Sequence, residues 1–139
     1  MEAFIQYHEA IGVLIARVFL GLLFLFQGYD AIFSIKIKNI IENYESSFES
    51  KGIPKILTIA GSWFTSLAEF LGGLFLVLGL FKYIALYLLG ADLIIASIAF
   101  GIATPMWDMR YVFPRLALLL FLLIIPVSWD LFTLDNIFF

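Results

Sequence analysis

Four long apolar runs alternate with short polar segments along the chain, and each run contains at least one ionisable residue. The runs cover approximately residues 10–33, 55–80, 83–104 and 112–132. A hydrocarbon core roughly 30 Å thick is crossed by about 20 helical residues, so each run is long enough to span a membrane. The pattern predicts an all-α fold: a transmembrane four-helix bundle in one domain, residues 1–139.

The segment between the first two runs, approximately residues 34–53, has a different pattern. Lysine and glutamate residues fill one side, and apolar residues recur at helical spacing on the other: Ile37, Ile40, Ile41, Tyr44 and Phe48. This pattern predicts an amphipathic interfacial helix on the membrane surface. The alternative is a helix packed across the mouth of the bundle. Gly52 and Pro54 are expected to end this helix and start the next.

Small residues follow one face of each of the first two runs. Gly21 and Gly28 share a face with Arg17, and Ser62, Ser66 and Gly73 share a face with Glu69. Small side chains allow two membrane helices to approach closely, so these faces are expected to contact protein rather than lipid. The short turn at residues 79–82 makes the second and third helices antiparallel neighbours.

Composition supports a membrane protein and excludes several other classes. The chain is 63% hydrophobic and only 14% charged, whereas soluble domains carry about 25% charged residues. The net charge of −3 argues against nucleic acid as a partner. With no cysteine and a single histidine, the chain offers no disulfide, no thiolate metal ligand and no bis-histidine haem site.

The distribution of basic residues predicts an orientation. Lys36, Lys38, Lys51, Lys55 and Arg110 lie on one side of the predicted bundle, and the positive-inside rule assigns that side to the cytoplasm and both termini to the outside. The N-terminus has no basic region before its apolar run, so no cleaved signal peptide is expected. The expected location is the inner (cytoplasmic) membrane of a bacterium, as a multi-pass protein in contact with the lipid bilayer.

Three ionisable residues are predicted to lie at similar depth inside the bundle: Arg17, Glu69 and Asp92. Counted from the ends of their runs, they are roughly 10–16 Å from the side that carries the N-terminus. One cation cannot pair with two carboxylates, so one carboxyl group would be free to hold a proton. A proton-holding group in an apolar pocket suits quinone chemistry, in which electrons move together with protons.

Four further residues are secondary candidates for this site. Trp63 and Tyr87 would supply a flat aromatic slot, Gln27 adds a polar group deeper in the first helix, and Arg115 is expected near the opposite interface, where it can extend to the headgroups. Two other interpretations stay open: Arg17 pairs with a carboxylate only to set the helix register, or the charges contact another subunit. Glu69 and Asp92 alone are too few ligands for a metal site.

Several motifs, taken in order, resemble those of the DoxX/DoxD-like family of small four-helix membrane proteins. The first helix carries Arg17, Gly21, Phe24 and Gly28, and the second carries AEFLGG at residues 68–73 followed by LGLF at residues 78–81. The ending PVSWDLFTLD, residues 126–135, is similar to the family's C-terminal motif, although the family's glycines and arginine are absent here.

The resemblance implies a functional context. Founding members of the family are subunits of a thiosulfate:quinone oxidoreductase, and the likeness carries over Arg17 and Glu69 as site residues. The leading hypothesis is therefore an integral membrane subunit of an oxidoreductase system that binds a quinone or another lipophilic substrate at an intramembrane charged site. The alternative is a non-enzymatic accessory or assembly subunit of a larger membrane complex. Expected partners are other membrane subunits or further copies of the chain.

Overall fold

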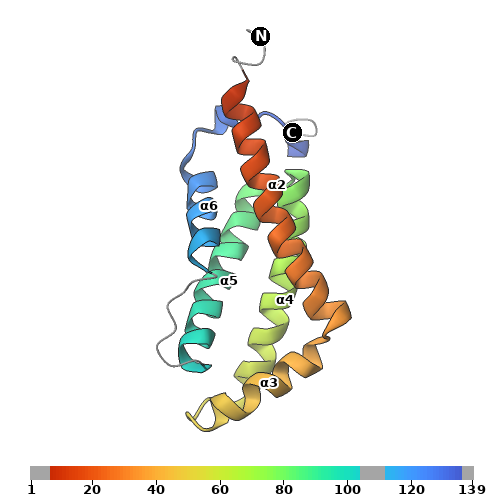
Figure 1. Cartoon of the computed structure of the whole chain (residues 1–139), viewed down its shortest axis with the longest axis vertical. Helices are drawn as coiled ribbons and strands as arrows, with labels where there is room; N and C mark the ends of the chain where they lie inside the picture. Colours follow the sequence, from red (N-terminus) through yellow and green to blue (C-terminus); the bar gives the residue numbers. More distant parts are fainter. Residues whose placement is uncertain (1–6, 104–111, 136–139) are drawn as a thin grey trace.

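The computed structural model describes residues 7–103 and 112–135, and every regular element in these residues is helical (Figure 1). The long elements are five α-helices: α2 (His8–Tyr29), α3 (Ile37–Glu49), α4 (Lys55–Leu78), α5 (Lys82–Ala103) and α6 (Phe113–Ile124). A π-helical turn, η1 (Asp30–Ser34), extends α2, and a 3₁₀ turn, η2 (Val127–Trp129), follows α6. The predicted all-α class is confirmed.

Three helical segments are long and apolar enough to cross a membrane: His8–Ser34, Lys55–Leu78 and Lys82–Ile102. The fourth predicted span is shorter than expected, because α6 has 12 residues and is therefore roughly 18 Å long. Ile125 has an extended backbone (ψ 152°) and precedes Pro126, and proline disfavours the helical conformation in the residue before it. The predicted helix over 112–132 therefore ends at Ile124.

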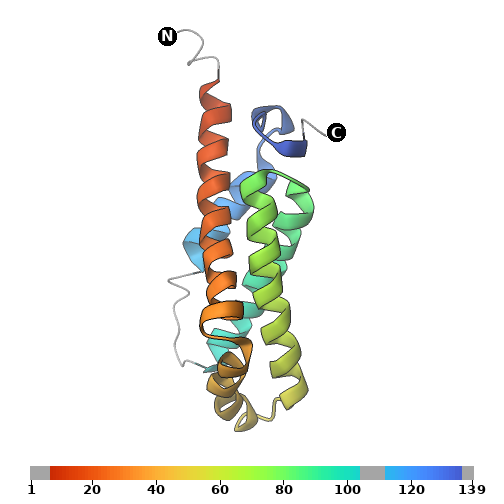
Figure 2. The same ribbon diagram turned by 90° about the vertical axis from the view of Figure 1, so that its right-hand side faces the viewer.

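Helices α2 and α4 pack closely because glycines lie at their contact (Figure 2). A Cβ atom at Gly73 would lie 2.5 Å from the Leu25 nitrogen and 2.8 Å from the Gly21 carbonyl oxygen. A Cβ atom at Gly28 would meet the backbone of Phe70. Backbone atoms cannot move aside as a flexible side chain can, so glycine is required here. The predicted close approach along the small-residue faces is confirmed.

The turn after α4 makes α4 and α5 antiparallel neighbours, as predicted (Figure 1). Gly79 ends α4 in the left-handed conformation (φ 71°), and the N–H of Leu80 donates to the carbonyl oxygen of Phe75 at 2.9 Å. Glycine adopts this conformation without steric cost, which is why it is common after helix ends. Helix α5 begins at Lys82, three residues beyond Gly79.

Helix α3 lies across the ends of α4 and α5 that are far from the start of α2 (Figure 1). Its residues Ile37 and Phe48 are buried, and the ammonium of Lys51 donates to the carbonyl oxygen of Ile102 at the end of α5. Gly52 (φ 81°) and Pro54 separate α3 from α4, as predicted. The apolar face of α3 therefore contacts the other helices, while its position relative to a membrane stays a prediction.

The apolar core joins α2, α4, α5 and α6, whose buried side chains include Leu20, Phe24, Leu76, Leu89 and Leu122. Many large apolar side chains lie on the outer surface instead, among them Phe19, Phe26, Ile84, Ile94 and Ile124. Such a surface is costly in water and favourable in lipid. Arg110, which enters the orientation argument, lies outside the described residues.

Candidate functional site

Arg17 is fully buried, and it contacts the C-terminal segment rather than Glu69 or Asp92. Its guanidinium lies 3.6 Å from an oxygen of Asp130 and donates to the carbonyl oxygen of Phe132 at 2.6 Å. The ammonium of Lys82, at the start of α5, lies 2.8 Å from the other Asp130 oxygen. We call Arg17, Lys82, Asp130 and Asp135 the terminal cluster; its two cations and two carboxylates balance in charge.

Asp135 connects the terminal cluster to the turn between α4 and α5. Its carboxylate accepts hydrogen bonds from the N–H groups of Phe81 (2.9 Å) and Lys82 (3.3 Å), and its own N–H donates to the Gly79 carbonyl oxygen (3.2 Å). The first N–H groups of a helix have no partner within the helix, so a carboxylate at this position stabilises the start of α5. The cluster holds the chain after α6 against the bundle.

The position of α2 explains why Arg17 is not beside Glu69. A Cβ atom at Gly79 would meet the Arg17 guanidinium, so Arg17 lies level with the turn between α4 and α5. Helix α2 therefore begins beyond that turn (Figure 1). The sequence-based depths assumed that the helices end at one level, and this assumption placed Arg17 too deep.

Glu69 and Asp92 do come together, with Gln27 and Arg115 as their partners. The carboxyl groups of Glu69 on α4 and Asp92 on α5 are close enough for each to affect the charge of the other, although neither Asp92 oxygen has a hydrogen-bond partner in the protein. The amide nitrogen of Gln27 donates to Glu69 at 3.2 Å, while the guanidinium of Arg115 donates to the amide oxygen of Gln27 and attracts both carboxyl groups. We call Gln27, Glu69, Asp92 and Arg115 the carboxyl cluster.

Arg115 is partly buried and its guanidinium contacts Gln27 and Phe24 of α2, whereas the sequence suggested that it extends toward the headgroups. Its guanidinium carbon lies 5.5 Å from the ring centre of Phe24, a buried residue of α2. In Figure 1, α6 begins alongside the middle of α5 rather than at its far end. The basic side chain thus reaches the level of Gln27, which is ten residues along α2 from Arg17, roughly 15 Å.

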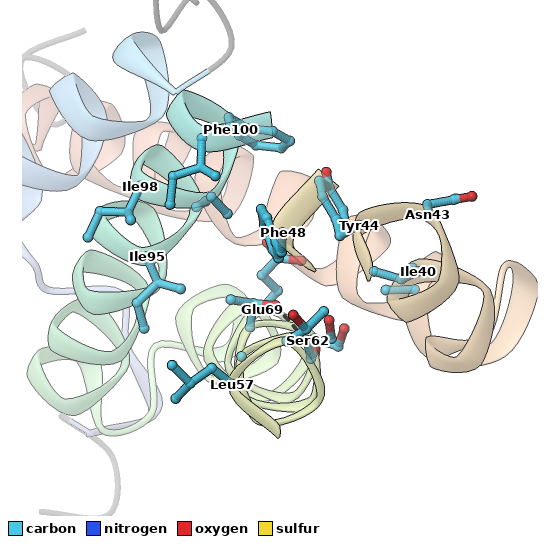
Figure 3. A pocket seen from close by; sticks show the side chains of 18 of the residues that line it. Ile40, Asn43, Tyr44, Phe48, Leu57, Ser62, Glu69, Ile95, Ile98 and Phe100 are labelled. Atoms are coloured by element: carbon cyan, nitrogen blue, oxygen red, sulfur yellow. Dashed lines mark hydrogen bonds between the residues drawn. The ribbon is translucent and has the colours of Figure 1, made fainter. Parts of the chain in front are cut away.

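A cavity of about 640 Å³ lies between α3, α4 and α5 (Figure 3). Gln27 of α2 and Asp30 of η1 also line it, and Glu69 is the lining residue furthest along α4 from α3. One wall is a row of polar residues on α4, and the opposite wall is formed by apolar side chains of α5 such as Ile95 and Ile98. Helix α3 covers the space with Ile40, Tyr44 and Phe48. The cavity is therefore apolar on one side, polar on the other, and acidic at its inner end.

The aromatic residues at the cavity differ from those expected. Trp63 is 48% exposed and lines a separate pocket beside α3, and Tyr87 is 67% exposed. The rings in the cavity wall belong to Tyr44, Phe48 and Phe100. Burial raises the pKa of the Tyr44 hydroxyl. The signal that could have identified Tyr44 and Phe48 is their place on the apolar face of the amphipathic helix.

Metal binding finds no support in the part of the chain that the structure describes. No three histidine, cysteine, aspartate or glutamate side chains gather there as ligands. Glu69 and Asp92 form a pair, and the other members of the carboxyl cluster are an amide and a guanidinium. The arrangement is suited to hydrogen bonding and proton exchange with an organic ligand.

These features define a class: a helical integral membrane protein with ionisable groups inside its bundle. A comparison with known families makes the class specific, because the DoxX family model matches residues 12–106. The chain belongs to the DoxX family, as its motifs predicted. Neither a curated protein nor a solved structure matches it. The matched region contains Arg17, Gln27, Glu69 and Asp92, and it ends before Arg115.

Proposed function

We propose that the chain is a membrane subunit of an oxidoreductase system and binds a quinone, or a lipophilic molecule of similar shape, in the cavity beside Glu69. The observation that carries this proposal is an apolar cavity of about 640 Å³ that ends at Gln27 and Glu69. Ligand cavities in proteins commonly measure about 300–1,000 Å³ and combine apolar walls with a few polar groups.

The polar end of the cavity suits a quinone headgroup. A quinone carbonyl oxygen is a hydrogen-bond acceptor, and the Gln27 amide and a protonated carboxyl group are both donors. The carboxyl cluster has two carboxyl groups and one guanidinium, so the cluster balances its charge when one carboxyl group keeps a proton. This proton is available to a reduced quinone oxygen. The electrons would come from a partner subunit.

The proposed membrane arrangement follows from the helix lengths. Helices α2, α4 and α5 span the bilayer, α6 packs on α2 and α5 to complete a four-helix bundle, and α3 lies at the interface. The bilayer in question is the bacterial inner membrane. Spin labels along α3 test this arrangement, because an interfacial helix has one face accessible to a water-soluble nickel chelate and the other to oxygen dissolved in lipid.

The binding proposal is tested by titrating the protein, in lipid nanodiscs, with a short-chain ubiquinone and a short-chain menaquinone analogue. Ala96 lines the cavity, and Ala96→Phe fills part of it. Ile94 is on the outer surface of the same helix, so Ile94→Phe is the matched control. A hydrogen bond between uncharged groups contributes about 0.5–1.5 kcal/mol, so Glu69→Leu should weaken binding about 2- to 10-fold.

Binding that is lost in Ala96→Phe and retained in Ile94→Phe supports the proposal. If neither quinone binds, or if Ala96→Phe and Ile94→Phe bind equally well, quinone binding in this cavity is refuted. A protein that binds no quinone but is isolated from its native membrane in a stable heteromeric complex, as seen by native mass spectrometry, would instead be an accessory subunit.

A further inference from the structure

The α4 wall of the cavity carries hydroxyl groups over its whole length. Thr58, Ser62, Thr65 and Ser66 line the cavity and lead along one helix face to Glu69. Except for the adjacent pair at 65 and 66, successive positions are separated by three or four residues, so these side chains share one face of the helix. The row runs from the end of the bundle under α3 to the carboxyl cluster, 11 residues along α4 or roughly 16 Å.

One hydroxyl group in this row, that of Thr58, has no hydrogen-bond partner in the protein. Thr58 is only 5% exposed. A buried hydroxyl without a partner is costly, and such groups are usually paired with ordered water. Thr58 lines the cavity, so the cavity is the place from which a water molecule can reach it.

The two walls of the cavity differ in their ability to hold water molecules by hydrogen bonds. The α5 side, with Ile95, Ile98 and Phe100, offers no hydrogen bonds to water from its side chains. The α4 side offers hydroxyl groups, which can accept hydrogen bonds from water and also donate them, except that the Thr65 hydroxyl donates to the Ser62 carbonyl oxygen at 3.2 Å. Water molecules held along α4 can therefore form a continuous hydrogen-bonded chain that ends at a carboxyl group.

We propose that the α4 hydroxyl row, from Thr58 to Ser66, holds a chain of water molecules that conducts protons between the α3 end of the bundle and the Glu69–Asp92 pair. The route deepens the proposed function, because it would supply the protons that quinone reduction at Glu69 consumes. It does not require a bound quinone. The transferred species is a proton, passed from water to water and finally to a carboxylate oxygen.

The first test uses the absence of cysteine from the chain, which gives an unreactive background. Thr58→Cys, Ser62→Cys and Ser66→Cys are prepared separately in nanodiscs and treated with a charged, membrane-impermeant methanethiosulfonate. This reagent reacts with the thiolate, which forms in water and not in lipid. The control is Leu71→Cys, on the exposed apolar surface of α4. We expect Thr58→Cys and Ser62→Cys to react about tenfold faster than the control or more.

The second test follows proton exchange at the carboxyl cluster itself. The infrared band of a protonated carboxyl group shifts on transfer to D₂O, and Glu69→Gln identifies the contribution of Glu69. Thr58→Val and Ser62→Ala remove hydroxyl groups at similar volume and should slow the shift several-fold. Ser97→Ala should not, because the Ser97 hydroxyl donates to the Leu93 carbonyl oxygen within α5 and does not line the cavity.

The route is overturned if Thr58→Cys and Ser62→Cys react no faster than Leu71→Cys, or if Thr58→Val and Ser62→Ala exchange as fast as Ser97→Ala. Its failure is distinct from failure of quinone binding. If Thr58→Cys and Ser62→Cys react fast but the protein binds no quinone, the proton route is supported and quinone binding is refuted. If the protein binds quinone but the cysteine variants do not react in quinone-free nanodiscs, quinone binding is supported and the proton route is refuted.

Discussion

The terminal cluster predicts an unequal cost for removing its two central members, Arg17 and Asp130. Breaking a buried ion pair by removing one partner costs about 3–5 kcal/mol, because the other charge is left uncompensated. In Arg17→Met, Asp130 still has Lys82 as a partner at 2.8 Å. The loss in free energy of unfolding for this variant should therefore be near the lower end of that range, about 3 kcal/mol. Asp130→Asn leaves two buried cations, Arg17 and Lys82, with Asp135 as the one carboxylate of the cluster, and should cost about 5 kcal/mol.

The double variant Arg17→Met/Asp130→Asn distinguishes a direct interaction from two separate effects. In the double variant one cation and one carboxylate, Lys82 and Asp135, are left in the cluster, so its charge is balanced again. We therefore expect the double variant to be less destabilised than the sum of the single variants by about 1 kcal/mol or more. Glu9 is on the surface of α2, and Glu9→Gln, the control, should change stability by less than about 0.5 kcal/mol.

The assay is equilibrium denaturation in detergent micelles, followed by the far-ultraviolet circular dichroism of the helices. If Arg17→Met costs more than Asp130→Asn, Lys82 does not compensate Asp130 and the described ion pairing is wrong. If the double variant equals the sum of the single variants, Arg17 and Asp130 act independently. Either result would refute the account of the C-terminal segment as held by charge.

Three further predictions concern other parts of the molecule. Gly73→Ala should destabilise by about 1–3 kcal/mol, because its Cβ atom would meet the α2 backbone; Gly12→Ala, in open space on α2, should be neutral or slightly stabilising in the same denaturation assay. Arg115→Leu should destabilise by about 3 kcal/mol or more because two buried carboxyl groups lose their cation, and adding Glu69→Gln should restore part of that loss; no restoration would show that the three groups are not coupled. Because burial raises the pKa of Tyr44, the folded state holds its phenol proton more tightly than the unfolded state. The stability from this group is present below the ordinary tyrosine pKa of about 10 and is lost as the pH rises above it. Denaturation midpoints of the wild type should therefore fall more steeply above about pH 10 than those of Tyr44→Phe, and parallel curves would contradict the burial of the hydroxyl.

The sequence determined the features that depend on local periodicity and composition. The long apolar runs specified the helices, Gly52 and Pro54 specified the break between α3 and α4, and Gly79 specified the end of α4. Gly21, Gly28 and Gly73 marked the faces of α2 and α4 that contact protein, and the tertiary structure showed that these two faces contact each other. The order of these motifs also identified the DoxX family.

The composition of the charged clusters depended on tertiary structure. Depth counted along each helix gives no information on where one helix begins relative to the next. Helix α2 begins beyond the turn at Gly79, so Arg17 lies with Lys82 and Asp130. Helix α6 begins alongside the middle of α5 and brings Arg115 to Gln27 (Figure 1).

The cavity was also decided by the tertiary structure. The sequence marked Glu69 and Asp92 as buried carboxyl groups, because apolar runs of that length leave no other place for them. It did not determine the walls of the cavity, because Tyr44 and Phe48 reach the cavity only through the position of α3 across α4 and α5. Which ionisable residues lie inside a helix follows from local pattern, and which of them meet follows from the relative positions of the helices.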